Sequence, residues 1–448
     1  MKITEKQLAI TSVASICGLL FIWVVPNTIA LRHILLVIGC LAGFGLIRYN
    51  WDRFCSIDPR FIPLFGIAGL FVWVLIHYIF FSLNPALELS EIKGLWMRTL
   101  LGAIAAVGLG IAIMNDSRLR LYLYIALFFT PFINIASYCW ASYLNHGLVK
   151  PNDFVRFLFT KIETAYFGAI AAAVATGNLI LLMKGRIDKA KTVQIFLWLL
   201  GLVLVLVSAL VSSTKNGIAI ALALCVLLAI VVVANSILHR GGSKVLSVAI
   251  LGVLVVLSAG IWEGHKSLAS RGWDSVFQDA ALGLDIDANQ QWQKREGSVP
   301  APLNSSGAEA ALNTYSRFAY AAVGIRLISQ YPLGYGSINR SFNGLQEQAQ
   351  IPHEHVGQVH SGWIDFGLAF GIPGLVLIFS SIFSIIYFGF KSKSSVVLPW
   401  VIVCLTFIPF GLIAEITWKQ YFEATVFFIA LSATMVALTP MASPKLRH

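Results

Sequence analysis

The chain has 448 residues, of which 58% are hydrophobic and only 12% are charged. A soluble domain carries about twice that charged fraction, so the composition excludes a single water-soluble globule and makes lipid the solvent for most of the chain. The net charge of +11 does not indicate nucleic-acid binding, because the basic residues occur in short runs between apolar stretches, which is the pattern of membrane topology.

Twelve apolar stretches follow one another along the chain, each close to the roughly 20 residues that a helix needs to cross the hydrocarbon layer. The first begins after only a few polar residues and is interpreted as an uncleaved helix rather than a signal peptide, because many spans follow it. The sequence therefore predicts an all-α polytopic membrane protein. Its spans are expected near residues 8–25, 31–47, 61–82, 95–114, 119–140, 162–183, 192–212, 217–235, 244–262, 362–390, 396–416 and 420–439.

The distribution of lysine and arginine predicts the orientation of these helices. With the N-terminus in the cytoplasm, the cytoplasmic connections hold 17 of the 32 basic residues but only five of the 21 acidic residues. This imbalance is the one that the positive-inside rule describes. We therefore expect both termini in the cytoplasm, nine transmembrane helices within residues 1–262, a periplasmic loop over 263–359 and three more helices within 360–448.

The loop over residues 263–359 is far longer than any other connection, and connections of this length are usually functional or disordered. Within it, Thr314–Tyr331 has apolar residues at roughly helical spacing, and Pro332–Gly336 supplies turn residues that would end such a helix. We expect a partly folded loop with amphipathic helices along the membrane surface. The apolar positions are Tyr315, Phe318, Ala321, Ala322, Ile325, Leu327 and Ile328.

His360 is the first candidate for chemistry. It lies where the chain re-enters the membrane, beside Ser361. A histidine at an interface can stay neutral near pH 7 and accept a proton from a hydroxyl group. The alternative is an interfacial histidine with no catalytic role, and position alone leaves both interpretations open.

Cations that could face the same space form a second group of candidates. Lys215 lies in a very short external turn between two spans, where a charge is costly and often functional, although a lysine there can also extend to the interface. Arg317 lies near the start of the loop helix, where a cation is unfavourable unless an anion such as a diphosphate balances it. Arg326 and Arg340 follow in the same loop, and a solvated surface position is the simpler interpretation of Arg326.

Two patterns in the loop resemble metal sites only weakly. The segment His353–His355 could cluster with His360, but its spacing is not His-Glu-x-x-His and no further ligand pattern completes it. The segment Asp285–Asp287 is a literal Asp-x-Asp, which holds a divalent ion in some glycosyltransferases, yet a solvated acidic turn is the simpler interpretation. The six cysteines are scattered, with no Cys-x-x-Cys spacing. We predict no metal site.

Taken together, these features resemble the O-antigen ligase and polymerase superfamily, whose members move glycans off undecaprenyl diphosphate at the periplasmic face of the bacterial inner membrane. The resemblance lies in the late external loop, the helix that carries Arg317, the Pro332–Gly336 turn and the family motif at the end of the loop. That motif is a histidine, then Asn, Ser or Gln, then nine residues and a glycine, usually with a second glycine three residues on. This chain matches it with His360, Ser361, Gly371 and Gly374.

The resemblance implies a GT-C-like architecture and a metal-independent, inverting glycosyl transfer that needs no cofactor. His360 would be the general base, and Lys215, Arg317 and Arg340 would bind the diphosphate of the donor. One position departs from the family, which commonly has arginine in a Ser-Arg-Gly-like turn where this chain has Lys215. Lysine keeps the charge but loses the paired hydrogen bonds of a guanidinium group.

Three activities share these motifs, and the sequence leaves them open. A ligase transfers O-antigen to lipid A–core oligosaccharide, a polymerase transfers a growing chain to another repeat unit, and an O-linked oligosaccharyltransferase transfers glycan to protein. We prefer the ligase. A twelve-helix transporter or lipid flippase is the alternative from another class, although the internal repeats that such transporters often show are not found here.

Overall fold

The computed structural model describes residues 3–23, 25–55, 58–151, 161–183, 188–238, 244–268, 275–294, 298–352, 354, 357–392, 394–417 and 419–439. Within these residues the regular structure is helical, and eleven helices are long and apolar enough to cross a membrane. A twelfth apolar helix, Leu398–Ile413, is shorter. The prediction of an all-α, multi-pass membrane protein is confirmed.

The helices that correspond to the twelve predicted spans each lie within about six residues of the expected range, and the fourth continues from shorter helical segments before it, so that the whole candidate span is Pro85–Asn115. They are α1 (Glu5–Ile22), α2 (Ile29–Tyr49), α4 (Ile62–Phe80), α6 (Met97–Asn115), α7 (Ser117–Leu144), α8 (Lys161–Leu182), α9 (Lys189–Val211), α10 (Lys215–Leu238), α11 (Lys244–Leu268), α15 (Gly362–Lys391), α16 (Leu398–Ile413) and α17 (Gln420–Ala437). The remaining helices are α3 (Trp51–Phe54), η1 (Pro59–Phe61), α5 (Pro85–Glu91), the π-helical turn η2 (Ile92–Trp96), α12 (Val276–Leu284), η3 (Gln291–Gln293), α13 (Leu312–Gln330) and α14 (Ser341–Gln348).

Side-chain caps define where several of these helices begin. The Thr4 hydroxyl accepts from the backbone N–H of Gln7, whose side chain returns a bond to the Thr4 backbone, so α1 starts with a capping box. Asp116 and Asp188 accept from backbone N–H groups in the first turns of α7 and α9. These bonds satisfy amide groups that a helix leaves unpaired at its start, which matters most where water is scarce.

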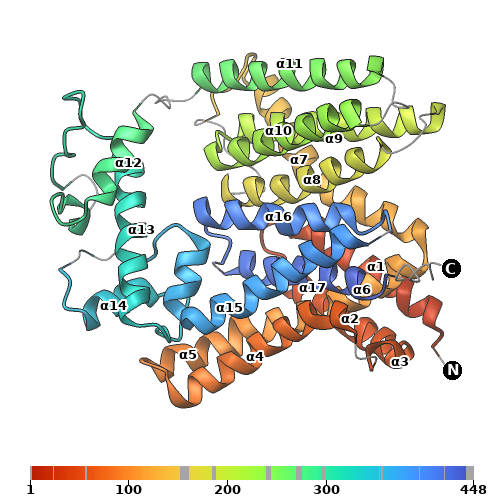
Figure 1. The fold of residues 1–448 in the computed structure, drawn as a ribbon, viewed down its shortest axis with the longest axis horizontal. Helices are drawn as coiled ribbons and strands as arrows, with labels where there is room; N and C mark the ends of the chain where they lie inside the picture. The colour runs from red at the N-terminus through yellow and green to blue at the C-terminus, as the bar shows by residue number, and fades with distance from the viewer. Residues whose placement is uncertain are drawn as a thin grey trace.

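The long loop folds over one end of the transmembrane bundle. In Figure 1 the long helices run side by side, and α12, α13 and α14 gather at one end of them, with α13 lying across the bundle rather than along it. The start of α1 and the end of α17 lie at the opposite end. The loop is therefore on the opposite side of the bundle from the ends of the described chain.

The loop has an apolar core of its own, built mainly around α13. Buried residues on α13 pack with Trp292, Phe342 and Leu345 of the loop and with Leu368 of α15. The helix itself was predicted, but the choice of its buried face was partly wrong: Phe318 is 38% exposed and Ile325 is 60% exposed. The buried face combines the small residues Ser316, Ala319 and Gly324 with larger ones. The buried positions are Tyr315, Ser316, Ala319, Tyr320, Val323, Gly324 and Leu327.

The turn Pro332–Gly336 and the kink in α15 form one contact. Gly371 breaks α15 with φ +66°, and Pro373 lacks the N–H that would reach the carbonyl of Ala369. Gly336 N–H donates to that carbonyl at 2.7 Å, and Tyr335 N–H donates to Leu368 O at 2.9 Å. A Cβ on Gly371 would lie 2.2 Å from Pro332 O. The glycine of the motif is thus needed so that the turn can dock against the broken helix.

Candidate functional site

His360 lies in the short segment that joins the loop to α15. Its backbone is in the left-handed region, with φ +64°, which is uncommon for a residue other than glycine and costs about 1–3 kcal/mol. Its side chain is 33% exposed, so one part of the ring is accessible while the other part is held by the protein. A strained residue that is held but accessible is typical of a functional position.

Glu415 is the residue that holds His360. The Nδ1 atom of His360 makes a very short contact with Glu415 Oε1, and Gln358 Nε2 donates to the other carboxylate oxygen at 3.1 Å. The Glu415 side chain is only 9% exposed. With Glu415 ionised and His360 neutral, Nδ1 carries the proton and donates to the carboxylate, which leaves the lone pair of the ring on Nε2.

The connection between α16 and α17 positions Glu415. Gly362 N–H donates to Ala414 O at 2.9 Å, and the Thr417 hydroxyl donates to Gly362 O at 2.8 Å. A Cβ on Gly362 would lie 2.9 Å from a side-chain carbon of Ile416 and 3.0 Å from its backbone nitrogen. Gly362, the first residue of α15, therefore packs directly against the segment that carries Glu415.

Asp365 stabilises the backbone on both sides of His360. This buried residue in the first turn of α15 accepts from the backbone N–H of Val359 at 2.8 Å, and its own backbone N–H donates to Ser361 O at 2.8 Å. These two bonds bracket His360 in sequence. They fix the backbone on both sides of the strained residue, so the imidazole has a defined direction.

Lys215 is an exposed residue at the start of α10, and its turn contacts the segment that carries Glu415. Asn216 Nδ2 donates to Ile413 O at 2.6 Å, two residues before Glu415. Ser213 has φ +51°, so the turn before Lys215 is also strained. The structure thus brings the 212–217 turn and the 411–417 segment together at the loop end of the bundle.

Arg317 is half-buried on α13. Gly324, seven residues on and therefore on the same helix face, packs so closely that a Cβ there would lie 2.6 Å from Ile364 and 3.2 Å from Val359. Seven residues correspond to about 10 Å along a helix. Arg317 therefore lies on the side of α13 that faces the segment around His360.

Arg340 is exposed immediately before α14. Its neighbours are anchored by a carboxylate of α5, because Glu91 accepts from the backbone N–H groups of Ile338 and Asn339, each at 2.9 Å. The next residue, Ser341, reaches Asp365 O only at 3.5 Å. Among the described contacts, none joins the Arg340 side chain to His360.

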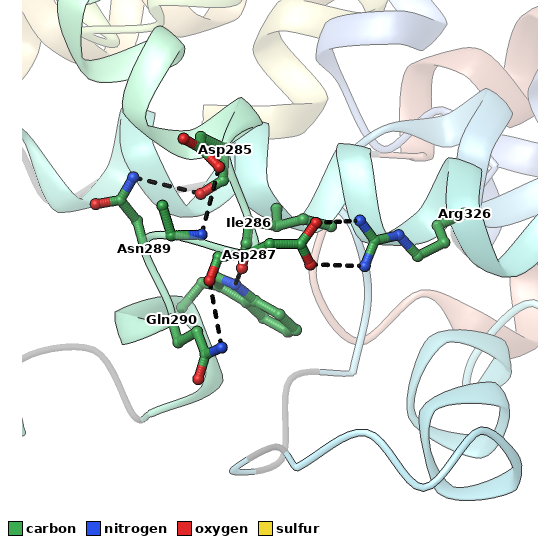
Figure 2. A network of polar contacts seen from close by, with 8 residues as sticks. Asp285, Ile286, Asp287, Asn289, Gln290 and Arg326 are labelled. Carbon is green, nitrogen blue, oxygen red and sulfur yellow. Dashed lines mark hydrogen bonds and ion pairs between the residues drawn. The ribbon is translucent and has the colours of Figure 1, made fainter.

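The Asp285–Asp287 segment has a structural role in the loop (Figure 2). The Asp287 carboxylate forms paired hydrogen bonds with Arg326 at 2.8 and 2.9 Å, and this partner lowers the pKa of Asp287 below its ordinary value. Asp285 instead accepts from Ala288 N–H at 3.3 Å and caps the following turn. Arg326 is therefore an exposed, ion-paired residue.

The weaker metal pattern falls partly outside the structure, because His353 and His355 are not among the described residues. Glu354 lies 3.4 Å from Lys294 as an ion pair. Within the described ranges, no three His, Cys, Asp or Glu side chains gather in a way that could hold a metal ion.

Glu415, Gln358 and Asp365 are the site residues that the sequence analysis missed. Glu415 and Asp365 did leave a signal, because each is an isolated acid at the edge of an apolar span, and charges at such places are costly and often functional. What the sequence did not reveal is the pairing, since Glu415 and His360 are 55 residues apart.

The arrangement can remove a proton from a hydroxyl group. The carboxylate of Glu415 fixes the tautomer and would stabilise the imidazolium that forms when Nε2 takes a proton, as the aspartate does in serine hydrolases. Cationic Lys215 and the N-terminus of α10 lie at the same end of the bundle, and both favour a neighbouring anion.

Comparison with known proteins is consistent with this site. No curated protein sequence matches the chain. A protein-family model described as O-antigen ligase matches residues 200–379, a stretch that includes Lys215, Arg317 and His360 but ends before Glu415. The match supports the resemblance seen in the motifs, because residues 200–379 are similar to the O-antigen ligase family.

Proposed function

We propose that this protein moves a glycan from undecaprenyl diphosphate onto lipid A–core oligosaccharide at the periplasmic face of the bacterial inner membrane. The family supports glycosyl transfer of the O-antigen ligase and polymerase type in general. The donor, the acceptor and the sidedness are our proposal. The observation that carries it is the His360–Glu415 pair, because a carboxylate-oriented imidazole at the membrane surface is suited to activate a sugar hydroxyl.

In the proposed reaction, Nε2 of His360 takes the proton of an acceptor hydroxyl as its oxygen attacks the anomeric carbon of the donor glycan. The bond between that carbon and the diphosphate oxygen breaks, and its electron pair leaves with the undecaprenyl diphosphate. Attack opposite to the leaving group inverts the anomeric centre. The diphosphate is a weak base, so the step needs no general acid, and the glycosyl-diphosphate bond supplies the driving force without nucleotide.

The cations would stabilise the negative charge that grows on the diphosphate. Lys215 would act as a point charge at the start of α10, and Arg317 would bind phosphate oxygens through paired hydrogen bonds. Arg340 is proposed as a further, more peripheral contact to the donor. Removing one such donor from a site of this kind typically lowers the rate by about 10²–10³. This mechanism uses no metal ion.

The His360–Glu415 pair serves equally well if the acceptor is another glycan repeat or a protein hydroxyl. Deletion of the gene followed by gel analysis of lipopolysaccharide separates these activities. Loss of all O-chain supports the ligase, a single repeat on the core indicates a polymerase, and intact lipopolysaccharide directs attention to protein or exopolysaccharide glycosylation.

Purified protein with undecaprenyl-diphosphate glycan and acceptor separates an enzyme from a transporter. Transfer without nucleotide or ion gradient supports the proposal. Transport of the lipid-linked glycan in liposomes without any transfer would overturn it.

A further inference from the structure

A cavity outside the proposed reaction site lies next to the connection that carries Glu415. This cavity of about 350 Å³ lies between α1, α2, α6, α8 and α17, and Lys419 and Gln420 at the end of the connection line it. This volume is in the range of sites that bind small molecules. His360 and Glu415 do not line the cavity, so it is distinct from the proposed reaction site.

The cavity is polar at one end and apolar along its depth. Arg32 lies in the first turn of α2, Arg98 is the second residue of α6 and Lys419 immediately precedes α17, so the cations lie at or near the start of their helices. Deeper positions are apolar, among them Leu36 and Phe428. Phe428 is nine residues beyond Lys419, or about 13 Å along the helix.

The charges at the polar end are partly balanced. Arg98 Nε donates to Glu423 Oε1 at 2.7 Å, and Glu423 is the one carboxylate among the lining residues. Arg32 donates to Val25 O at 2.9 Å and to the Thr28 hydroxyl at 3.0 Å, and both of these acceptors are uncharged. Three cations therefore face one carboxylate in the lining.

A second carboxylate lies close by without lining the cavity. Glu163 on α8 accepts from Gln420 and acts on Arg32 electrostatically. Among the described residues, the three cations Arg32, Arg98 and Lys419 outnumber the two carboxylates Glu423 and Glu163 by one. An unbalanced charge at the edge of the bilayer is energetically costly. An anionic ligand would neutralise the excess positive charge at the polar end of the cavity.

The cavity opens beside the first turns of α2. Ile29 and His33 both line it and are exposed, which leaves an entrance from the membrane side of the protein. The remaining walls are formed by buried residues such as Ile16 and Leu20 of α1. An occupant would therefore enter between lipids, with its polar part at the ends of the helices and its chain among the apolar walls.

We propose that this cavity binds a phosphate-bearing lipid, with the phosphate at Arg32, Arg98 and Lys419 and the hydrocarbon chain between α1, α2 and α17. The inference does not depend on the proposed glycosyl transfer, because it rests on the charge and the shape of a separate cavity. Both a polyprenyl phosphate and an ordinary membrane phospholipid have this chemistry.

Native mass spectrometry of the full-length protein in detergent tests the proposal. The probes are undecaprenyl phosphate, phosphatidylglycerol and the uncharged alcohol undecaprenol. Gly102 lines the cavity, and a Cβ there would meet no atom within 4 Å, so Gly102→Leu fills the cavity without backbone clash and with better helix propensity. A second variant, Arg32→Gln with Lys419→Gln, removes two cations and keeps the shape.

One control variant matches the cavity-filling change, and a third cavity variant separates the effect of net charge from that of a single cation. Gly252→Leu makes the same substitution on α11, also with no atom within 4 Å of a Cβ, away from the cavity. Arg98→Gln with Glu423→Gln removes an ion pair and leaves the net charge of the cavity unchanged.

We expect one bound phosphate lipid in the wild type and in Gly252→Leu. Its affinity should fall on the order of tenfold or more in Gly102→Leu and in Arg32→Gln with Lys419→Gln, as loss of charge-assisted hydrogen bonds predicts, and by less in Arg98→Gln with Glu423→Gln. Tighter binding of undecaprenyl phosphate identifies the occupant as a polyprenyl carrier, and tighter binding of phosphatidylglycerol identifies it as a bulk phospholipid. Equal binding of undecaprenol, or unchanged binding in the filled and uncharged variants, would overturn the proposal.

Discussion

Replacing Glu415 with glutamine tests the central pair of the site. Glutamine has nearly the same shape but only one accepting oxygen, whereas the two oxygens of Glu415 accept from His360 and Gln358. If the new amide group faces His360, it donates to Nδ1 and moves the ring proton to Nε2, where it blocks the proposed base. If the new oxygen faces His360, the tautomer survives but the negative charge is lost.

The magnitude follows from these two outcomes. A hydrogen bond to a charged group contributes about 1.5–3 kcal/mol, so loss of the charge alone, if it acts only in the transition state, lowers the rate about 10–150-fold. In a serine hydrolase, a catalytic histidine in the wrong tautomer lowers the turnover by about 10⁴ even though the geometry of the site is unchanged. We therefore expect Glu415→Gln to lower kcat by about 10–10⁴, with a smaller effect on KM for the lipid donor.

The assay is transfer of a purified undecaprenyl-diphosphate glycan to its acceptor, measured as initial rates over a range of donor concentrations. Glu347→Gln is the matched control, because Glu347 is an exposed carboxylate on α14 with no side-chain contact to His360 among the described interactions. Thermal unfolding in detergent should show both variants folded. A Glu415→Gln protein that is folded and within threefold of the wild-type kcat would refute the orienting role of Glu415.

Four further predictions concern the proposed reaction. His360→Ala should abolish transfer while the protein still inserts and folds, because it removes the proposed base; normal activity would remove His360 from the mechanism. Lys215→Arg should keep more activity than Lys215→Ala, because the charge is retained, and equal losses in initial rate would instead indicate a packing role. Arg317→Ala should lower the rate at limiting donor by about 10²–10³, and unchanged donor kinetics would exclude its contact with the diphosphate. EDTA should leave the rate unchanged, whereas a loss that a divalent ion restores would return attention to the Asp285–Asp287 segment.

The resemblance to the family rested on residues that are close in sequence, and this is why it could be recognised without a structure. His360, Ser361 and Gly371 lie within one short segment, and residues 200–379 match the family model as a continuous stretch. The structure gives a physical reason for the presence of two of these residues. His360 is strained and held, while Gly371 makes room for a turn that ends at Gly336. The roles of His360, Lys215, Arg317 and Arg340 in catalysis remain predictions.

The sequence by itself determined which segments cross the membrane and that α13 is a helix. In a bilayer each segment must satisfy its own backbone hydrogen bonds, so hydropathy over about 20 residues suffices to predict a span. Helical spacing is a local property as well, and it identified α13 even though it included the exposed residues Phe318 and Ile325.

Only the tertiary structure decided which side chains meet. The pairing of His360 with Glu415, the bond from Asn216 to Ile413 and the ion pair of Arg326 with Asp287 each join residues that are distant in the chain. Such contacts depend on which helix ends are neighbours in the bundle, and no local pattern encodes that. The same packing of α1, α2, α6, α8 and α17 creates the cationic cavity, whose lining residues are spread from the first helix to the last.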